Sequence, residues 1–145
     1  MTSINLSKQH PKVYQAVMAL DAEVREALSA AGIDPKLGEL IRIRVSQLNG
    51  CAFCLRMHTR DALALGESTD RLAVLPAWRE SQYFDEVEQA ALELAEDVTL
   101  LEDEADQDKE RGPLSDEQVS ALSWLTITMN AWNRIAVRSH YPVRP

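Results

Sequence analysis

The sequence predicts an all-α fold of about six to seven helices in a single domain that spans residues 1–145. Three observations lead to this prediction. Apolar residues recur at spacings of three and four along most of the chain, no segment keeps a strict alternation of apolar and polar residues, and no β-α-β rhythm appears. The chain has 145 residues, of which 46% are hydrophobic, and a chain of this length can bury enough surface to fold without a metal or a disulfide.

The first half of the chain shows two helix patterns separated by a sharp boundary. In residues 11–31 one apolar stripe is formed by Val13, Val17, Leu20, Val24 and Leu28. Asp34 and Pro35 then provide a cap and a suitable first helical residue for the next helix. We expect that helix to end at Gly50, because glycine readily adopts the left-handed conformation that often closes a helix.

Four further helices are expected over residues 51–65, 69–75, 85–101 and 115–138. Ser115 and Gln118 have the spacing of a capping box at the start of the last one. This last helix is apolar around much of its circumference, so we expect it to be central. Residues 77–84 are expected to be irregular, and the acidic residues 102–110 are expected to form a solvated loop.

The charge balance of the chain disfavours several classes of partner. The net charge is -8 and the sequence pI is about 4.8. An acidic surface repels phosphate backbones and anionic membranes, so neither nucleic acid nor a membrane is an expected partner. No apolar run approaches the roughly 20 residues that span a bilayer, and the N-terminal residues lack the apolar segment of a secretory signal. We therefore expect a cytoplasmic protein.

The two cysteines of the chain, Cys51 and Cys54, form a CxxC motif at the expected start of a helix. Residues three apart lie on one helical face, so the two sulfurs can close a small disulfide ring. The unpaired N–H groups and the helix dipole at this end favour the thiolate, which is the reactive form of cysteine. A close pair in a reducing compartment indicates redox chemistry or metal binding rather than a secreted disulfide framework.

His58 and Glu39 extend this motif. His58 follows Cys54 by four residues on the same helical face, where an imidazole can exchange a proton with a thiol. Glu39 lies in the preceding helix, and a tight turn at Gly50 would make the two helices antiparallel. Glu39 and His58 then lie at compatible depths, although the spacing alone does not establish a contact.

Other interpretations of these residues stay open at this point. A CxxC pair can supply half of a zinc site, but zinc usually takes four ligands and His58 is the one further candidate nearby. The cysteines can also be inert core residues, His58 a surface or core histidine, and Glu39 a solvated helix residue. A thioredoxin-like domain is disfavoured because it places its CxxC after a strand in a β-α-β context.

Residues 39–58, ELIRIRVSQLNGCAFCLRMH, resemble the core motif of the alkylhydroperoxidase AhpD-like family of the carboxymuconolactone decarboxylase superfamily. The residues that match the spacing of this motif without a gap are Glu39, Cys51, Cys54 and His58. The later stretch NAWNR, residues 130–134, also resembles members of the family. Two features depart from the best-known peroxidase members: Phe53 stands where they carry a histidine, and the motif occurs once rather than in a longer two-part arrangement. Relatives that act as decarboxylases lack the CxxC pair, which argues against decarboxylation of a lactone.

The resemblance implies a thiol-dependent peroxidase that acts without a cofactor or a metal. Cys54 would be the peroxidatic thiolate and become a sulfenic acid, and Cys51 would resolve it as a disulfide and be the exposed sulfur that meets the reductant. The helix dipole alone would instead favour Cys51 as the attacking thiolate. Glu39 would act as the base and His58 as the proton relay. The implied partners are a hydroperoxide substrate and a dithiol reductant or lipoyl-type donor protein.

The resemblance also implies a homo-oligomer, such as a dimer, trimer or hexamer. Trp78, Tyr83 and Phe84 can contribute to an interface, or they can simply cover the core. Ser46 is interpreted as a packing or surface residue, with a hydroxyl that supports the site as the alternative. Two other functions stay open: a non-catalytic redox sensor or disulfide-exchange module of the same fold, and a zinc-binding structural domain.

Overall fold

The computed structural model describes residues 3–102 and 112–145, which form seven α-helices, one 3-10 helix and no β-strand. The elements are α1 (Leu6–Gln9), α2 (Pro11–Ala30), α3 (Pro35–Asn49), α4 (Ala52–Ala64), α5 (Thr69–Val74), η1 (Leu75–Glu80), α6 (Glu86–Leu100) and α7 (Asp116–Arg138). The all-α prediction is therefore confirmed. None of the helices in these residues is long and apolar enough to cross a lipid bilayer.

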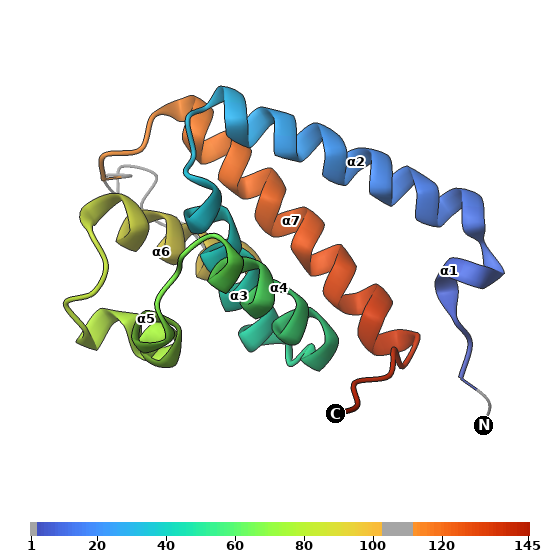
Figure 1. Ribbon diagram of the computed structural model, residues 1–145. Helices are drawn as coiled ribbons and strands as arrows, with labels where there is room; N and C mark the ends of the chain where they lie inside the picture. The colour runs from blue at the N-terminus through green and yellow to red at the C-terminus, as the bar shows by residue number, and fades with distance from the viewer. Residues whose placement is uncertain (1–2, 103–111) are drawn as a thin grey trace.

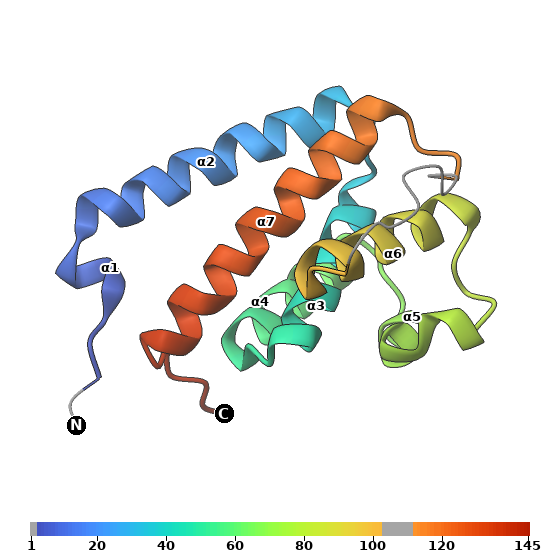
Figure 2. The ribbon, with the colours of Figure 1, turned by 180° about the vertical axis from the view of Figure 1, so that it is seen from behind.

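Helix α7 lies at the centre of the fold. It packs along α2, α3 and α6, and less extensively against α4. Figures 1 and 2 show α2 and α7 crossing the molecule together, with α3, α4 and α6 on the other side of α7. The apolar residues that α7 buries are Ala121, Leu122, Leu125, Met129 and Ala136. Neighbours on several sides explain why this helix is apolar around much of its circumference.

The helix ends follow the local signals of the sequence. Asp34 accepts a hydrogen bond from the Lys36 N–H at the start of α3, and Gly50 ends that helix with a φ of 67°. Asp85 and Ser115 each complete a capping box, at the starts of α6 and α7. The predicted boundaries of all six expected helices agree with the observed ones to about one residue.

The N-terminal region differs from the prediction. The short helix α1 was not expected; Asn5 caps it, and the Leu6 N–H donates to Ser139 Oγ at 3.0 Å beyond the end of α7. Val13 was expected to lie on a buried stripe, but 63% of it is exposed. Figures 1 and 2 show that α2 and α7 diverge toward the start of α2. Val13 and Tyr14 there line a cavity of about 350 Å³, and the ring of Tyr14 lies 5.5 Å from that of Trp132.

The aromatic residues around η1 divide between core and surface. Trp78 and Phe84 are buried, whereas 48% of Tyr83 is exposed. The Trp78 indole donates to Glu96 Oε1 at 2.8 Å, which anchors η1 on α6. The interpretation that these aromatics cover the core therefore fits Trp78 and Phe84. The acidic loop expected over residues 102–110 lies outside the described residues beyond Glu102, which is exposed.

Candidate active site

The turn between α3 and α4 places the two cysteines. Gly50 reverses the chain in a left-handed conformation, and Cys51 follows as the N-cap of α4. Cys54 lies in the first turn of α4, where its N–H donates to Cys51 Sγ at 3.3 Å. A disulfide joins Cys51 to Cys54. The small ring expected from the CxxC spacing is thus present.

Both cysteines are buried, with 1% of Cys51 and 2% of Cys54 exposed. The expectation that Cys51 is the exposed sulfur is therefore wrong. The Cys51 N–H donates to the Ser46 carbonyl at 3.0 Å, which fixes Cys51 against the last turn of α3. A reactant can reach the sulfurs only when the side chains around them move.

Glu39 and His58 meet in the core between α3 and α4. Glu39 Oε2 lies 2.9 Å from His58 Nδ1, and both side chains are buried. This contact confirms the depth matching expected for two antiparallel helices joined at Gly50. His58 lies one turn after Cys54 on α4, so the carboxylate, the imidazole and the CxxC pair follow one another along the same helix pair.

Arg42 is a buried partner of Glu39 that the motif did not indicate. Arg42 Nη1 lies 3.0 Å from Glu39 Oε1, so each oxygen of the carboxylate has its own partner. Burial raises the pKa of Glu39, but the hydrogen bond to His58 and the Arg42 charge outweigh it and hold that pKa below its usual value of 4.5. Burial lowers the pKa of Arg42, and Glu39 partly offsets this effect. The spacing of three residues on one helix was the available signal.

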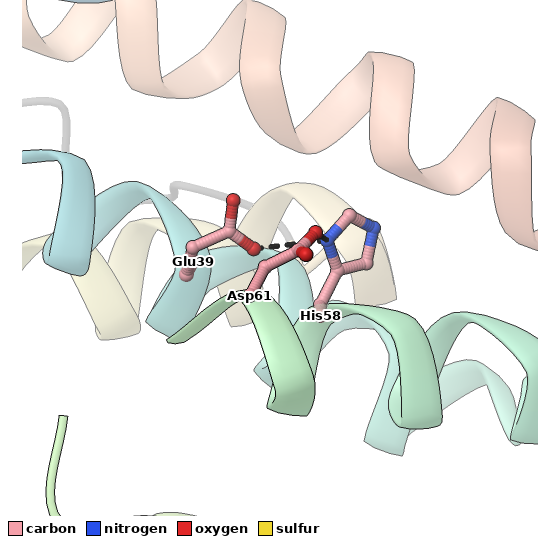
Figure 3. Close-up of side chains that lie close together, drawn as sticks. All are labelled: Glu39, His58 and Asp61. Atoms are coloured by element: carbon pink, nitrogen blue, oxygen red, sulfur yellow. Dashed lines mark hydrogen bonds and ion pairs between the residues drawn. The ribbon is translucent and has the colours of Figure 1, made fainter. Parts of the chain in front are cut away.

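A second carboxylate, Asp61, approaches the same imidazole from the surface. Asp61 Oδ2 lies 3.8 Å from His58 Nδ1, and 55% of the Asp61 side chain is exposed. Figure 3 shows Glu39 and Asp61 both directed toward the His58 ring. Within the described residues, these three side chains are the one group whose metal-ligand atoms all lie within 4.8 Å of one another. The Arg42 charge beside Glu39 opposes a cation here, so we assign no metal to the group.

A polar network fixes the end of α3 against α7. Ser46 is fully buried and donates to the Arg42 carbonyl at 2.7 Å. Asn133 Nδ2 donates to Ser46 Oγ at 3.0 Å. Asn49 Nδ2 donates to Oδ1 of Asn130 at 2.9 Å and to Oδ1 of Asn133 at 3.0 Å. Ser46 is thus buried rather than at the surface, and its hydroxyl belongs to the network through which the NAWNR stretch supports the turn that carries the cysteines.

The C-terminal tail lies against the start of α4. The ring of Tyr141 meets that of Phe53, the second x of CxxC, edge to face at 5.1 Å. Arg56 Nη1 donates to the Arg144 carbonyl at 2.6 Å. These contacts join residues more than 80 positions apart, so the spacing within the motif could not have revealed them.

Comparison with known proteins adds evidence independent of this geometry. The model of the carboxymuconolactone decarboxylase family matches residues 11–97. An uncharacterized protein of Bacillus subtilis (strain 168), YdfG, is 38% identical over 124 residues, which cover 83% of this chain and 84% of that protein. An uncharacterized protein of Escherichia coli (strain K12), YnjA, is 31% identical over 68 residues, which cover 47% of this chain and 37% of that protein.

A solved structure is similar over nearly the whole chain. It is the crystal structure of a protein of unknown function from Agrobacterium tumefaciens, for which a role in antioxidant defence as AhpD has been suggested. The two chains are 34% identical, the TM-score is 0.84, and the match covers 99% of this chain and 100% of the other.

Proposed function

Because this chain belongs to the carboxymuconolactone decarboxylase family and carries a disulfide-forming CxxC pair on an AhpD-like fold, we propose that it is a thiol-dependent peroxidase. The observation that carries the proposal is the buried hydrogen bond of 2.9 Å between Glu39 and His58, one helical turn from Cys54. An imidazole in this position can take a proton from a thiol and pass it to a leaving oxygen. Glu39 orients the ring and balances its charge while it holds the proton.

The proposed cycle uses the two sulfurs in turn. The Cys54 thiolate attacks the O–O bond of a hydroperoxide, which gives a Cys54 sulfenic acid and, with one proton, an alcohol. The Cys51 thiol then attacks the sulfenic sulfur, so that a disulfide forms and water leaves. A dithiol donor reduces this disulfide by giving up two hydrogens and becoming a disulfide itself. The net reaction converts a hydroperoxide and a dithiol to an alcohol, water and a disulfide.

Steady-state consumption of cumene hydroperoxide with a panel of dithiol donors tests this proposal. We expect Cys54→Ser to abolish turnover and His58→Gln to reduce it about a hundredfold, which is the usual contribution of a general acid–base group. Met57→Ala, which changes an exposed residue next to His58, serves as the matched control and should keep full turnover. Full turnover by Cys54→Ser would disprove the assigned role of that cysteine.

A redox sensor or disulfide-exchange module is the second candidate function, and the disulfide between Cys51 and Cys54 is the observation that favours it. Such a protein would form the Cys51–Cys54 disulfide once but would not consume peroxide repeatedly with any donor. The ratio of peroxide consumed to protein present separates the two functions. A ratio that stays near one favours the sensor, and a ratio that rises with time favours the peroxidase.

A further inference from the structure

A cavity of about 600 Å³ borders the turn that carries the CxxC motif. It is lined by Asn49, Asn133, Arg134, Val137, Arg138 and His140. These residues come from the ends of α3 and α7 and from the turn after α7, which lie at one end of the molecule (Figures 1 and 2). Asn49 is two residues before Cys51, so the cavity borders the turn that carries the disulfide, although neither cysteine is among its lining residues. Its volume is within the usual range for a site that binds a small molecule.

The charge of this cavity is opposite to that of the whole chain. Its lining contains three basic side chains and no acidic one, although the net charge of the chain is -8. Arg134, Arg138 and His140 are exposed, and none of them forms an ion pair within the described part of the chain. The described arginines that do pair with a carboxylate are Arg25, Arg42, Arg44, Arg71 and Arg79. The cavity therefore offers two exposed arginine side chains that form no ion pair with a carboxylate of the described residues.

The two arginines of the cavity differ in their surroundings. Arg134 is held in place because its Nη1 donates to Oδ1 of Asn130 at 2.8 Å and to the Asn130 carbonyl at 3.2 Å. Arg134 also lines a second cavity together with Asp97 and Glu102, so the negative charges of these two acids lower the positive potential around its guanidinium. Arg138 lines the first cavity but not the second. The fork of a guanidinium matches a carboxylate, and Val137, which lines the same cavity and is 48% exposed, provides apolar surface for a short aliphatic chain.

We propose that this cavity binds the carboxylate of a small aliphatic thiol donor and so selects which reductant reaches the Cys51–Cys54 disulfide. The proposal rests on the proposed function, because it concerns the step that regenerates the dithiol. In that step the two thiols of the donor lose two hydrogens and close a disulfide, while the Cys51–Cys54 bond opens to two thiols.

Dihydrolipoate and dihydrolipoamide are the matched probes, since they carry the same dithiol and differ in a carboxylate against a carboxamide. The rate of reduction of the Cys51–Cys54 disulfide is measured by intact mass after acid quenching, with no peroxide present. We expect dihydrolipoate to react about fivefold faster, which is the size of effect that one ion pair near the surface provides. Equal rates for the two probes would overturn the proposal.

Variants then test whether the cavity is the cause of this preference. Arg138→Gln should reduce the rate ratio of the two probes, and the double variant Arg134→Gln/Arg138→Gln should bring it to about one. Lys12→Gln/Lys36→Gln removes two positive charges from exposed positions outside the cavity and should keep the ratio. A preference that survives in the arginine double variant would place the binding site elsewhere and overturn the proposal.

An equilibrium measurement separates this proposal from the peroxidase proposal. Octanoate should shift the side-chain amide signals of Asn49 and Asn133 in nitrogen-15 spectra of the oxidised protein, whereas octanamide should leave them unchanged. This result would support the carboxylate site even if the protein fails to consume peroxide. Equal shifts with both compounds, or none with either at millimolar concentration, would exclude a carboxylate site in this cavity.

Discussion

Glu39 contributes both to the stability of the fold and to the proposed chemistry. Its two carboxylate oxygens are divided between the Arg42 guanidinium at 3.0 Å and the His58 imidazole at 2.9 Å. A buried carboxylate is stable only when its oxygens are paired in this way. The pairing therefore fixes the orientation of the ring that stands one turn from Cys54, and removal of the carboxylate should affect both stability and turnover.

The stability effect of Glu39 should depend on pH. Because the pKa of Glu39 lies below its usual value of 4.5 in the folded chain, its ionised form stabilises the fold above the unfolded pKa, and this contribution is lost as the pH falls through the folded pKa. We expect Glu39→Gln to lower the free energy of unfolding by about 3 kcal/mol at neutral pH, with a difference from the parent that shrinks below about pH 4.5. Urea denaturation across the acidic range measures this difference, with the exposed Glu26→Gln as control. A constant difference at every pH would contradict the linkage.

The sequence revealed part of this site but not its surroundings. The contact of Glu39 with His58 could be expected, because a tight turn and the helical rise determine which residues of two antiparallel helices lie at the same depth. Arg42 and Asp61 are each three residues from a motif residue and could have been found from that spacing. The burial of Cys51 could not, because it depends on the packing of elements distant in sequence.

At the scale of elements, the joint between α3 and α7 depends on buried amides rather than on apolar packing alone. Asn133 is both acceptor for Asn49 and donor to Ser46. We expect Asn133→Ala to lower the free energy of unfolding by about 2 kcal/mol, because it leaves buried polar groups without a partner. Urea denaturation tests this expectation. Ser123→Ala is the control on the same helix, because the Ser123 hydroxyl donates to the Val119 carbonyl within α7. If this control lowers the free energy of unfolding as much as Asn133→Ala does, the result would argue against the role of the network.

Helix boundaries were the most predictable feature at this scale, because each depends on a few neighbouring residues. Caps such as Asp34 and Ser115 and the left-handed Gly50 end or begin a helix through local hydrogen bonds and backbone conformation. The tail after α7 shows the limit of local signals. His140 turns the chain with a φ of 52°, and Tyr141 then packs on Phe53 of α4, a contact between distant parts of the chain.

The tail should control access to the disulfide. Since Tyr141 contacts Phe53, one of the two residues between the cysteines, Tyr141→Ala should let a small thiol reach the sulfurs more often. We expect dithiothreitol to reduce the disulfide of this variant about tenfold faster, as a loss of about 1.4 kcal/mol of packing would allow. Quenched intact-mass measurements follow the reaction. Tyr83→Ala removes a half-exposed tyrosine elsewhere and should react at the parent rate, so equal acceleration in both variants would indicate general loosening.

At the scale of the whole molecule, a dithiol cycle requires a fold that is stable with the disulfide open as well as closed. The core supplies this stability, because α7 and its neighbours bury apolar side chains that do not depend on the disulfide. A ring closed between residues three apart restrains little of the unfolded chain and contributes about 2 kcal/mol. We expect reduction to lower the melting temperature by only about 5 °C for a domain of this size. Calorimetry of the oxidised and the reduced protein measures this change in melting temperature, and the double variant Cys51→Ser/Cys54→Ser is the reference that cannot form the disulfide. A protein that unfolds on reduction at room temperature would be unable to complete the proposed cycle.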